Sequence, residues 1–177
     1  MEAELPGTDE PIDLDPTLPD QMRIAVANLM LAWGAYDSAV TYWLAKTLGT
    51  PLDVASIMYG NMQTEPKLQK IRAIFDHYGM KEAASGITQL LSAHRQRVIV
   101  RNAVAHSRCV GRPKSNLDHF AFSTVRHVKG DPGMMALTMV PYDEMLLSTR
   151  FANESHLQIM EIAGRGPQVV GPADKNE

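Results

Sequence analysis

From about residue 20 onward, apolar residues recur every three or four positions, which is typical of helices that bury one face. The first of these stretches stops at Gly49, as helices often do. Thr50 and Pro51 follow as a capping residue and a first helical residue, which marks the start of another helix. The pattern predicts four consecutive helices, over residues 20–48, about 51–60, 65–78 and about 81–107.

The periodicity changes after residue 113. Phe120, Phe122 and Thr124 alternate with smaller or polar residues, and residues 130–133 have the composition of a turn, so we expect a β-hairpin over about 119–140. A last helix is predicted from Pro141 to about Ala163, with Leu146, Leu147, Ile159, Met160 and Ile162 as its apolar positions. The predicted fold is therefore all-α, an up-and-down bundle of about five helices with a small β-hairpin inserted before the last helix.

Both ends of the chain differ from this helical domain, which is predicted over residues 20–163. We expect an acidic flexible leader over residues 1–19 and a flexible Gly/Pro-rich tail over 164–177. The chain begins without the pattern of a secretory signal, and its longest apolar stretch, Ile24 to Trp33, is too short to span a bilayer. The single Cys109 forms no internal disulfide, and no Cys/His cluster has zinc spacing. These features predict a cytoplasmic protein with no membrane partner, no metal and no cofactor.

The residues most informative about function lie near the end of the fourth predicted helix. Arg101, Asn102 and His106 interrupt an apolar run that begins at Val98 and continues to Ala105. A helical segment that is apolar all round is buried, so its polar groups need partners or a purpose. Arginine offers a planar cation that suits phosphate, and histidine changes its protonation state near neutral pH. Together these residue types are the minimum needed to cleave a phosphodiester.

The string Arg101-Asn102-x-x-x-His106 resembles the Arg-polar-x-x-x-His motif of the HEPN superfamily of small helical domains. The order of the predicted helices is also similar to that family's bundle, so the resemblance covers roughly residues 21–163. Many members are metal-independent endoribonucleases of the toxin or defence type, and such a role implies an antitoxin protein as a partner. Members controlled by nucleotide transfer carry Tyr two residues after the motif His. Arg108 stands there in this chain, which argues against that form of control.

Metal-free cleavage of RNA needs a base for the ribose 2′-OH, an acid for the leaving 5′-oxygen and positive charge beside the phosphate. We expect His106 to act as acid or base and Arg101 to stabilise the phosphate. Asn102 lies four residues before His106 on the same helix face, where its amide suits the imidazole or a phosphate oxygen. A single His cannot be acid and base at once, so the resemblance implies a homodimer that brings two motifs into one cleft. His94 is predicted to be a satisfied core or seam histidine instead.

Charge is distributed unevenly along the chain. Residues 1–20 hold seven acidic and no basic residues, which leaves 17 basic against 13 acidic residues, a net charge of +4, on the rest. Between residues 94 and 129, eight Lys or Arg stand against Asp118 alone. Such a concentration would attract a polyanion, and we expect that partner to be RNA, with a merely solvated basic face as the alternative. The residues predicted to bind nucleic acid are Arg95, Arg97, Arg108, Arg112 and Lys114.

Two other functions stay open at this point. One is a non-catalytic HEPN-like module that binds RNA or a nucleotide through the same basic cleft. The other is a helical interaction or structural protein, in which Arg101 pairs with a carboxylate such as Asp37 or Asp76. In that case Asn102 bonds a neighbouring helix, and His106 caps the carboxyl end of its own helix, where cations are favoured.

Overall fold

The computed structural model describes residues 12–128 and 131–165. In this part of the chain, five helices and four strands follow one another. The helices are α1 (Asp20–Leu48), α2 (Leu52–Tyr59), α3 (Thr64–His77), α4 (Lys81–Ala105) and α5 (Tyr142–Gly164). The strands are β1 (Leu14–Asp15), β2 (Arg108–Pro113), β3 (His119–Val128) and β4 (Asp131–Pro141).

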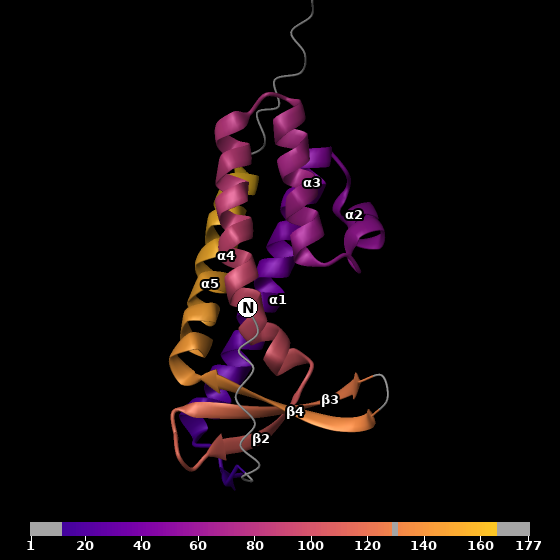
Figure 1. Ribbon diagram of the computed structural model, residues 1–177. Coiled ribbons are helices and arrows are strands. Elements are labelled where there is room, and N and C mark those ends of the chain that lie inside the picture. Colours follow the sequence, from indigo (N-terminus) through magenta and orange to yellow (C-terminus); the bar gives the residue numbers. More distant parts are fainter. Residues whose placement is uncertain (1–11, 129–130, 166–177) are drawn as a thin grey trace, which may run out of the picture.

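The four longer helices form a bundle, and an antiparallel sheet lies at one end of it (Figure 1). α3 and α4 run antiparallel side by side, α5 packs extensively against α1, and the short α2 projects from the bundle next to α3. The strand order is β1-β2-β3-β4. The chain is therefore mostly helical, as predicted, but its strand content is larger than the single hairpin that we expected.

Glycines mark the ends of two helices. α1 ends at Gly49, whose φ of 62° is left-handed and whose N–H bonds the carbonyls of Ala45 and Lys46. Gly79, with a φ of 71°, separates α3 from α4 in the same way. Only glycine adopts this conformation at little cost, which is why these positions stop helices so reliably. The predicted boundaries of α1, α2, α3 and α4 are confirmed to within two residues. The predicted cap of α2 is wrong, because Pro51 and not Thr50 is its N-cap residue.

The core of the bundle centres on the aromatic residues of α1. The ring centroids of Trp33 and Tyr36 lie 5.5 Å apart in an edge-to-face arrangement, and Phe151 of α5 packs against both. The indole N–H of Trp33 donates to Ser148 Oγ at 3.0 Å, and the Ser148 hydroxyl donates to the carbonyl of Arg97 at 3.0 Å. One buried hydroxyl therefore ties α1, α5 and α4 together.

The buried face of α5 differs from the predicted one. Small residues, Ser148, Ala152 and Ser155, form much of this face and let α5 approach α1 closely. Because small residues contribute little to an apolar pattern, the larger side chains dominated the prediction. Of the five predicted apolar positions only Ile159 is buried, and Leu146, Leu147, Met160 and Ile162 are exposed.

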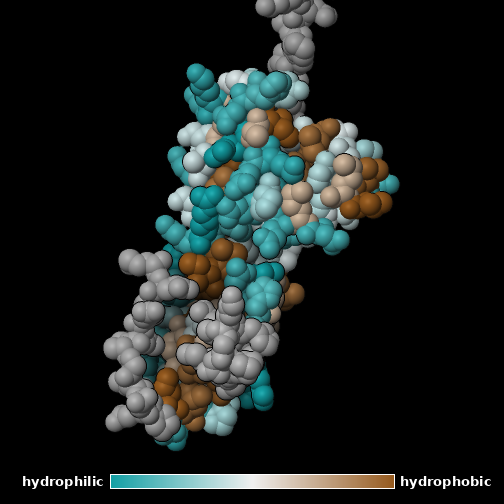
Figure 2. Space-filling model, turned by 45° about the vertical axis from the view of Figure 1, so that its right-hand side comes forward, coloured by the Kyte–Doolittle hydropathy of each residue, from teal (hydrophilic) through white to brown (hydrophobic). Residues whose placement is uncertain are grey.

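α2 is attached through little buried surface. Ala55 is its one buried residue, whereas Leu52, Ile57 and Met58 are exposed, Ile57 to 84%. In Figure 2 hydrophobic side chains gather at the right of the upper part of the molecule, where α2 lies. α2 leads directly into residues 61–63, which matter for the site described below.

The predicted hairpin corresponds to β3 and β4, but β2 was not predicted. β2 is rich in Gly, Pro and basic residues and lacks an alternating pattern. Gly111 has a φ of 127°, and a Cβ on it would lie 2.2 Å from the backbone oxygen of Asp15. The glycine therefore permits a close approach of β1 that no other residue would allow.

The first described residues of the chain are part of this sheet. Leu14 pairs with Pro113 and Asp15 with Arg112, and the Asp13 carbonyl accepts a bond from the N–H of Lys114. The prediction of a flexible leader over residues 1–19 is therefore wrong for residues 13–15. Residues 1–11 of the leader and 166–177 of the predicted tail lie outside the described residues. No helix within the described ranges is long and apolar enough to cross a bilayer.

Candidate functional site

A cleft of about 480 Å³ opens between α1, the amino end of α3 and the second half of α4. The Arg95–Glu65 ion pair marks the level at which α3 begins beside α4. From there α4 continues through Gln96–Ala105, about 15 Å along its axis, with no part of α3 beside it. This uncovered stretch of α4 forms one wall of the cleft. The residues that line it include Asp37, Thr64, Glu65, Arg101, Asn102 and His106.

All three residues of the Arg-polar-x-x-x-His motif line this cleft. Arg101 is half-buried, and its Nη1 donates to Asn102 Oδ1 at 3.0 Å, while Asn102 and His106 are exposed. His106 is the C-cap residue of α4, held by a bond from its backbone N–H to the Asn102 carbonyl at 3.1 Å. The apolar neighbours of the motif predict that it is enclosed in the bundle. In the structure the motif instead faces an open cleft.

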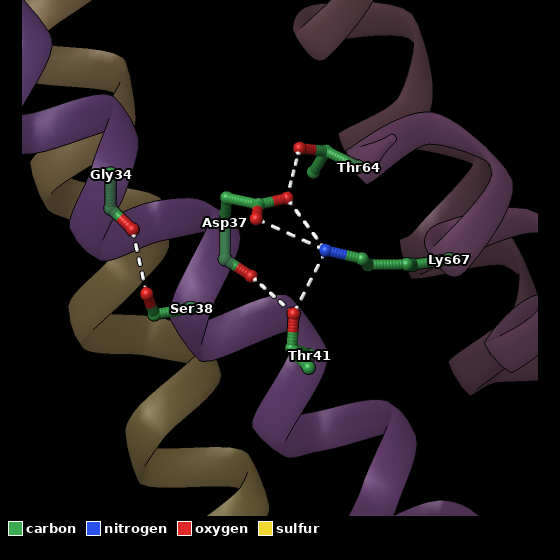
Figure 3. A network of polar contacts seen from close by, with 6 residues as sticks. All are labelled: Gly34, Asp37, Ser38, Thr41, Thr64 and Lys67. Carbon is green, nitrogen blue, oxygen red and sulfur yellow. Dashed lines mark hydrogen bonds and ion pairs between the residues drawn. The ribbon is translucent and has the colours of Figure 1, made fainter. Parts of the chain in front are cut away.

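Asp37 in the α1 wall of the cleft is bound by Lys67 and Thr64 (Figure 3). The Lys67 side chain is fully buried, and its Nζ lies 3.0 Å from each Asp37 carboxylate oxygen and 2.9 Å from Thr41 Oγ1. The Thr64 hydroxyl donates to Asp37 Oδ1 at 2.6 Å. This network joins α1 to the amino end of α3 and neutralises the carboxylate.

Glu65, the other acidic residue of the cleft, has its own cation. Nη2 and Nε of Arg95 donate to Glu65 Oε1 at 2.6 and 2.9 Å, and this guanidinium lowers the pKa of the Glu65 carboxyl. Arg101 has no ion-pair partner in the part of the chain that the structure describes. Because both carboxylates are paired and Arg101 is not, the described residues leave this cleft with an excess of positive charge.

The structural alternative for the motif has little support in these contacts. Asp37 pairs with Lys67, and Asp76 lies 3.9 Å from Arg72, so the expected pairing of Arg101 with either carboxylate is wrong. The Asn102 side chain bonds Arg101 of its own helix instead of a neighbouring helix. His106 does occupy the C-cap position that the alternative gave it.

Most of the basic residues predicted to bind nucleic acid are engaged elsewhere. Arg95 pairs with Glu65 and Arg97 with Glu144, at 2.6 and 2.7 Å. In the sheet, carboxylates of the leader pair with two further cations, because side chains distant in sequence meet where β1 joins β2. These pairs are Arg112–Asp15 and Lys114–Asp13, both at 3.0 Å. Of the five predicted residues, Arg108 alone has no ion pair among the described residues, so the local excess of positive charge is smaller than the sequence indicates.

His94 is a cleft residue that sequence reasoning underestimated. It is 4% exposed and packs against the rings of Trp33 and Tyr36, with centroids 5.4 and 5.9 Å away, so its predicted place in the core is confirmed. Its Nδ1 is buried without a hydrogen-bond partner, so the expectation that it is satisfied is wrong. His94 and His106 are twelve positions apart, about 18 Å along α4, and cannot act on the same phosphodiester.

Burial of His94 predicts a dependence of stability on pH. Desolvation lowers the pKa of His94 in the folded protein, so the unfolded chain takes up this proton first as the pH falls. We therefore expect the free energy of unfolding to decrease below about pH 6.5, and His94→Leu to remove part of that decrease. Urea unfolding at pH 7.5 and 5.5 measures both, with the exposed His77→Leu as the matched control. Equal losses on acidification in wild type and His94→Leu would contradict this assignment.

Comparisons of this chain with protein-family models, with curated proteins and with solved structures find no match. Within residues 12–128 and 131–165, no three His, Cys, Asp or Glu side chains are grouped so as to hold a metal ion.

Proposed function

We propose that the protein is a metal-independent endoribonuclease of the toxin or defence type, built on a HEPN-like bundle. One observation carries this proposal. Arg101 and His106 line the same open cleft, and among the described residues Arg101 has no carboxylate partner and the His106 imidazole no hydrogen bond. They are five positions apart, about 7.5 Å along the axis of α4, a separation that one phosphate and its ribose can bridge.

The reaction consistent with these residues transfers the phosphoryl group within the RNA. The ribose 2′-oxygen attacks phosphorus, its proton passes to a base, and the bond from phosphorus to the 5′-oxygen breaks as that oxygen gains a proton from an acid. Arg101 donates two hydrogen bonds to the non-bridging oxygens as their charge grows, and His106 supplies the acid or the base. Asn102 Oδ1 accepts from the guanidinium, so Asn102 acts through Arg101 as a positioning residue.

A second acid or base has to come from outside the cleft of one chain, because His94 lies too far along α4. An isologous homodimer would supply the His106 of a second copy. Ile99, two residues before Arg101, is 67% exposed, and such a dimer would cover this apolar surface beside the motif. A strictly monomeric species in light scattering at the assay concentration would contradict the dimer.

A non-catalytic module that binds RNA or a nucleotide is the second candidate. The observation that favours it is the pairing of Arg95, Arg97, Arg112 and Lys114 with carboxylates, because these residues then add little to a long RNA path. Both candidates predict binding that weakens steeply as salt rises, since phosphate contacts release counterions. Turnover separates the two.

The first test replaces Arg101. We expect Arg101→Ala to lower the rate of cleavage of a labelled single-stranded RNA in EDTA by about 10²–10³-fold, because a donor to the growing phosphate charge is lost. Arg150→Ala is the matched control, since Arg150 is an exposed arginine of α5 that does not line the cleft and has no ion pair within the described residues. Equal cleavage rates for the wild type and Arg101→Ala would contradict a catalytic role of Arg101.

A further inference from the structure

We propose that the amino end of α3 holds a second phosphate of the bound RNA. The cleft then takes a single strand with two successive phosphates, one at Arg101 and His106 and the other at Thr64 and Glu65. This inference rests on the proposed function and names the substrate of that site as a strand and not a mononucleotide.

The amino end of α3 is open toward the cleft. Gln63 is its N-cap residue and makes no side-chain capping bond, although it lines the cleft. The Thr64 hydroxyl, which could otherwise cap this end of the helix, donates to Asp37. The backbone N–H groups of Thr64 and Glu65 have no acceptor among the described residues, and Pro66 has no N–H to offer. Uncapped N–H groups and the positive end of the helix dipole are suited to bind a phosphate.

A separate observation at the same level of the cleft also points to a missing ligand. His94 lines the cleft together with Thr64 and Glu65 of the first turn of α3. The His94 side chain is almost fully buried and lines the cleft, and its buried Nδ1 has no hydrogen bond within the described chain. Buried polar side chains nearly always have a partner, and a phosphate oxygen is an acceptor for an imidazole N–H.

Two ion pairs, one with a buried lysine and one with an exposed arginine, make this end of the cleft acceptable to an anion. Asp37 and Glu65 would repel a phosphate if they stood alone. Lys67 neutralises the first from inside the protein, and Arg95 neutralises the second. The fully buried Lys67 therefore has a role in the site as well as in the fold. It neutralises the Asp37 carboxylate in the wall without occupying the cleft.

The distance between the two ends of the cleft decides the size of the substrate. Arg95, level with the start of α3, is six positions before Arg101 and eleven before His106, or about 9 and 16 Å along α4. One phosphate that contacts His106 cannot also reach the N–H groups of Thr64 and Glu65. A strand that continues to its next phosphate can reach both ends.

The test compares the binding of short 2′-O-methyl oligoribonucleotides, which lack the attacking hydroxyl and so report binding apart from cleavage. We expect the wild type to bind a trimer, with two phosphates, about tenfold more tightly than a dimer with one, as charge-assisted hydrogen bonds imply. Gln63→Asp places a carboxylate on the free N–H groups, as N-cap residues do, and should weaken trimer binding more than dimer binding, which removes this preference. Gln89→Asp, an equal charge change on an exposed position of α4 outside the cleft, should retain it.

Equal affinities of the wild type for dimer and trimer would overturn the inference, as would a trimer preference that survives Gln63→Asp. Failure of the proposed function gives a different result. If unmodified RNA is never cleaved but the trimer preference is present and sensitive to Gln63→Asp, the nuclease is refuted and the second phosphate site stands.

Discussion

His106→Ala is expected to lower the rate of metal-free RNA cleavage by about 10²–10⁴-fold, which is the usual contribution of a positioned acid or base. The reason is geometric, because His106 lies five positions after Arg101, about 7.5 Å along α4, whereas His94 lies about 18 Å from the position of His106. Rates on a labelled single-stranded RNA in EDTA measure the loss. RNA binding should persist, since Arg101 and the amino end of α3 are unchanged.

His77→Ala is the matched control for this variant. His77 is an exposed histidine at the last position of α3, and the opposite end of that helix faces the cleft. We expect it to cleave RNA at the wild-type rate. If His106→Ala and His77→Ala were equally active, the imidazole of His106 would have no part in the chemistry.

The largest expected effect on stability concerns the ion pair in Figure 3. Asp37→Ala leaves the charge of Lys67 fully buried, with Thr41 as its one remaining partner among the described residues, so we expect the free energy of unfolding to fall by about 3–5 kcal/mol. Lys67→Met instead leaves the Asp37 carboxylate unpaired, but this side chain is 40% exposed and reaches water. We therefore expect the free energy of unfolding to fall by about 1–3 kcal/mol. Urea unfolding with comparison of midpoints measures both losses.

The double variant Asp37→Ala with Lys67→Met tests whether the two effects share one cause. It should lose less stability than the sum of the single variants, because removing both partners leaves no unpaired charge. Additive losses, or a larger loss for Lys67→Met than for Asp37→Ala, would show that the pair is not organised around the buried lysine.

The helices could be predicted from the sequence because their signals are local. Gly49 and Gly79 end helices through their own backbone conformation, and each flanking apolar pattern lies within one continuous segment. β2 could not be predicted, since its pairing with β1 depends on contacts between residues almost a hundred positions apart, as in Arg112 with Asp15. The buried face of α5 was missed for another reason, namely that Ser148 and Ala152 pack by being small.

In the candidate site, too, the residues with local signals could be predicted and those that depend on distant contacts could not. Arg101, Asn102 and His106 are close in sequence on one helix, so their spacing was enough to place them together. The residues of the opposite wall lie on α1 and α3. Its ion pairs join residues thirty positions apart, such as Lys67 with Asp37. The sequence shows how many charged residues the basic segment contains but not which of them form ion pairs. For this reason it predicted more unpaired cations than the structure has.

Cleavage of a labelled single-stranded RNA by the wild-type protein in EDTA, with analysis of the product ends, tests the central claim most directly. We predict cleavage that yields 2′,3′-cyclic phosphate and 5′-hydroxyl ends, because the 2′-oxygen is the nucleophile and Arg101 and His106 need no metal. No cleavage of any RNA by folded wild-type protein, or products with 5′-phosphate ends, would contradict the assignment of this cleft as a metal-independent ribonuclease site.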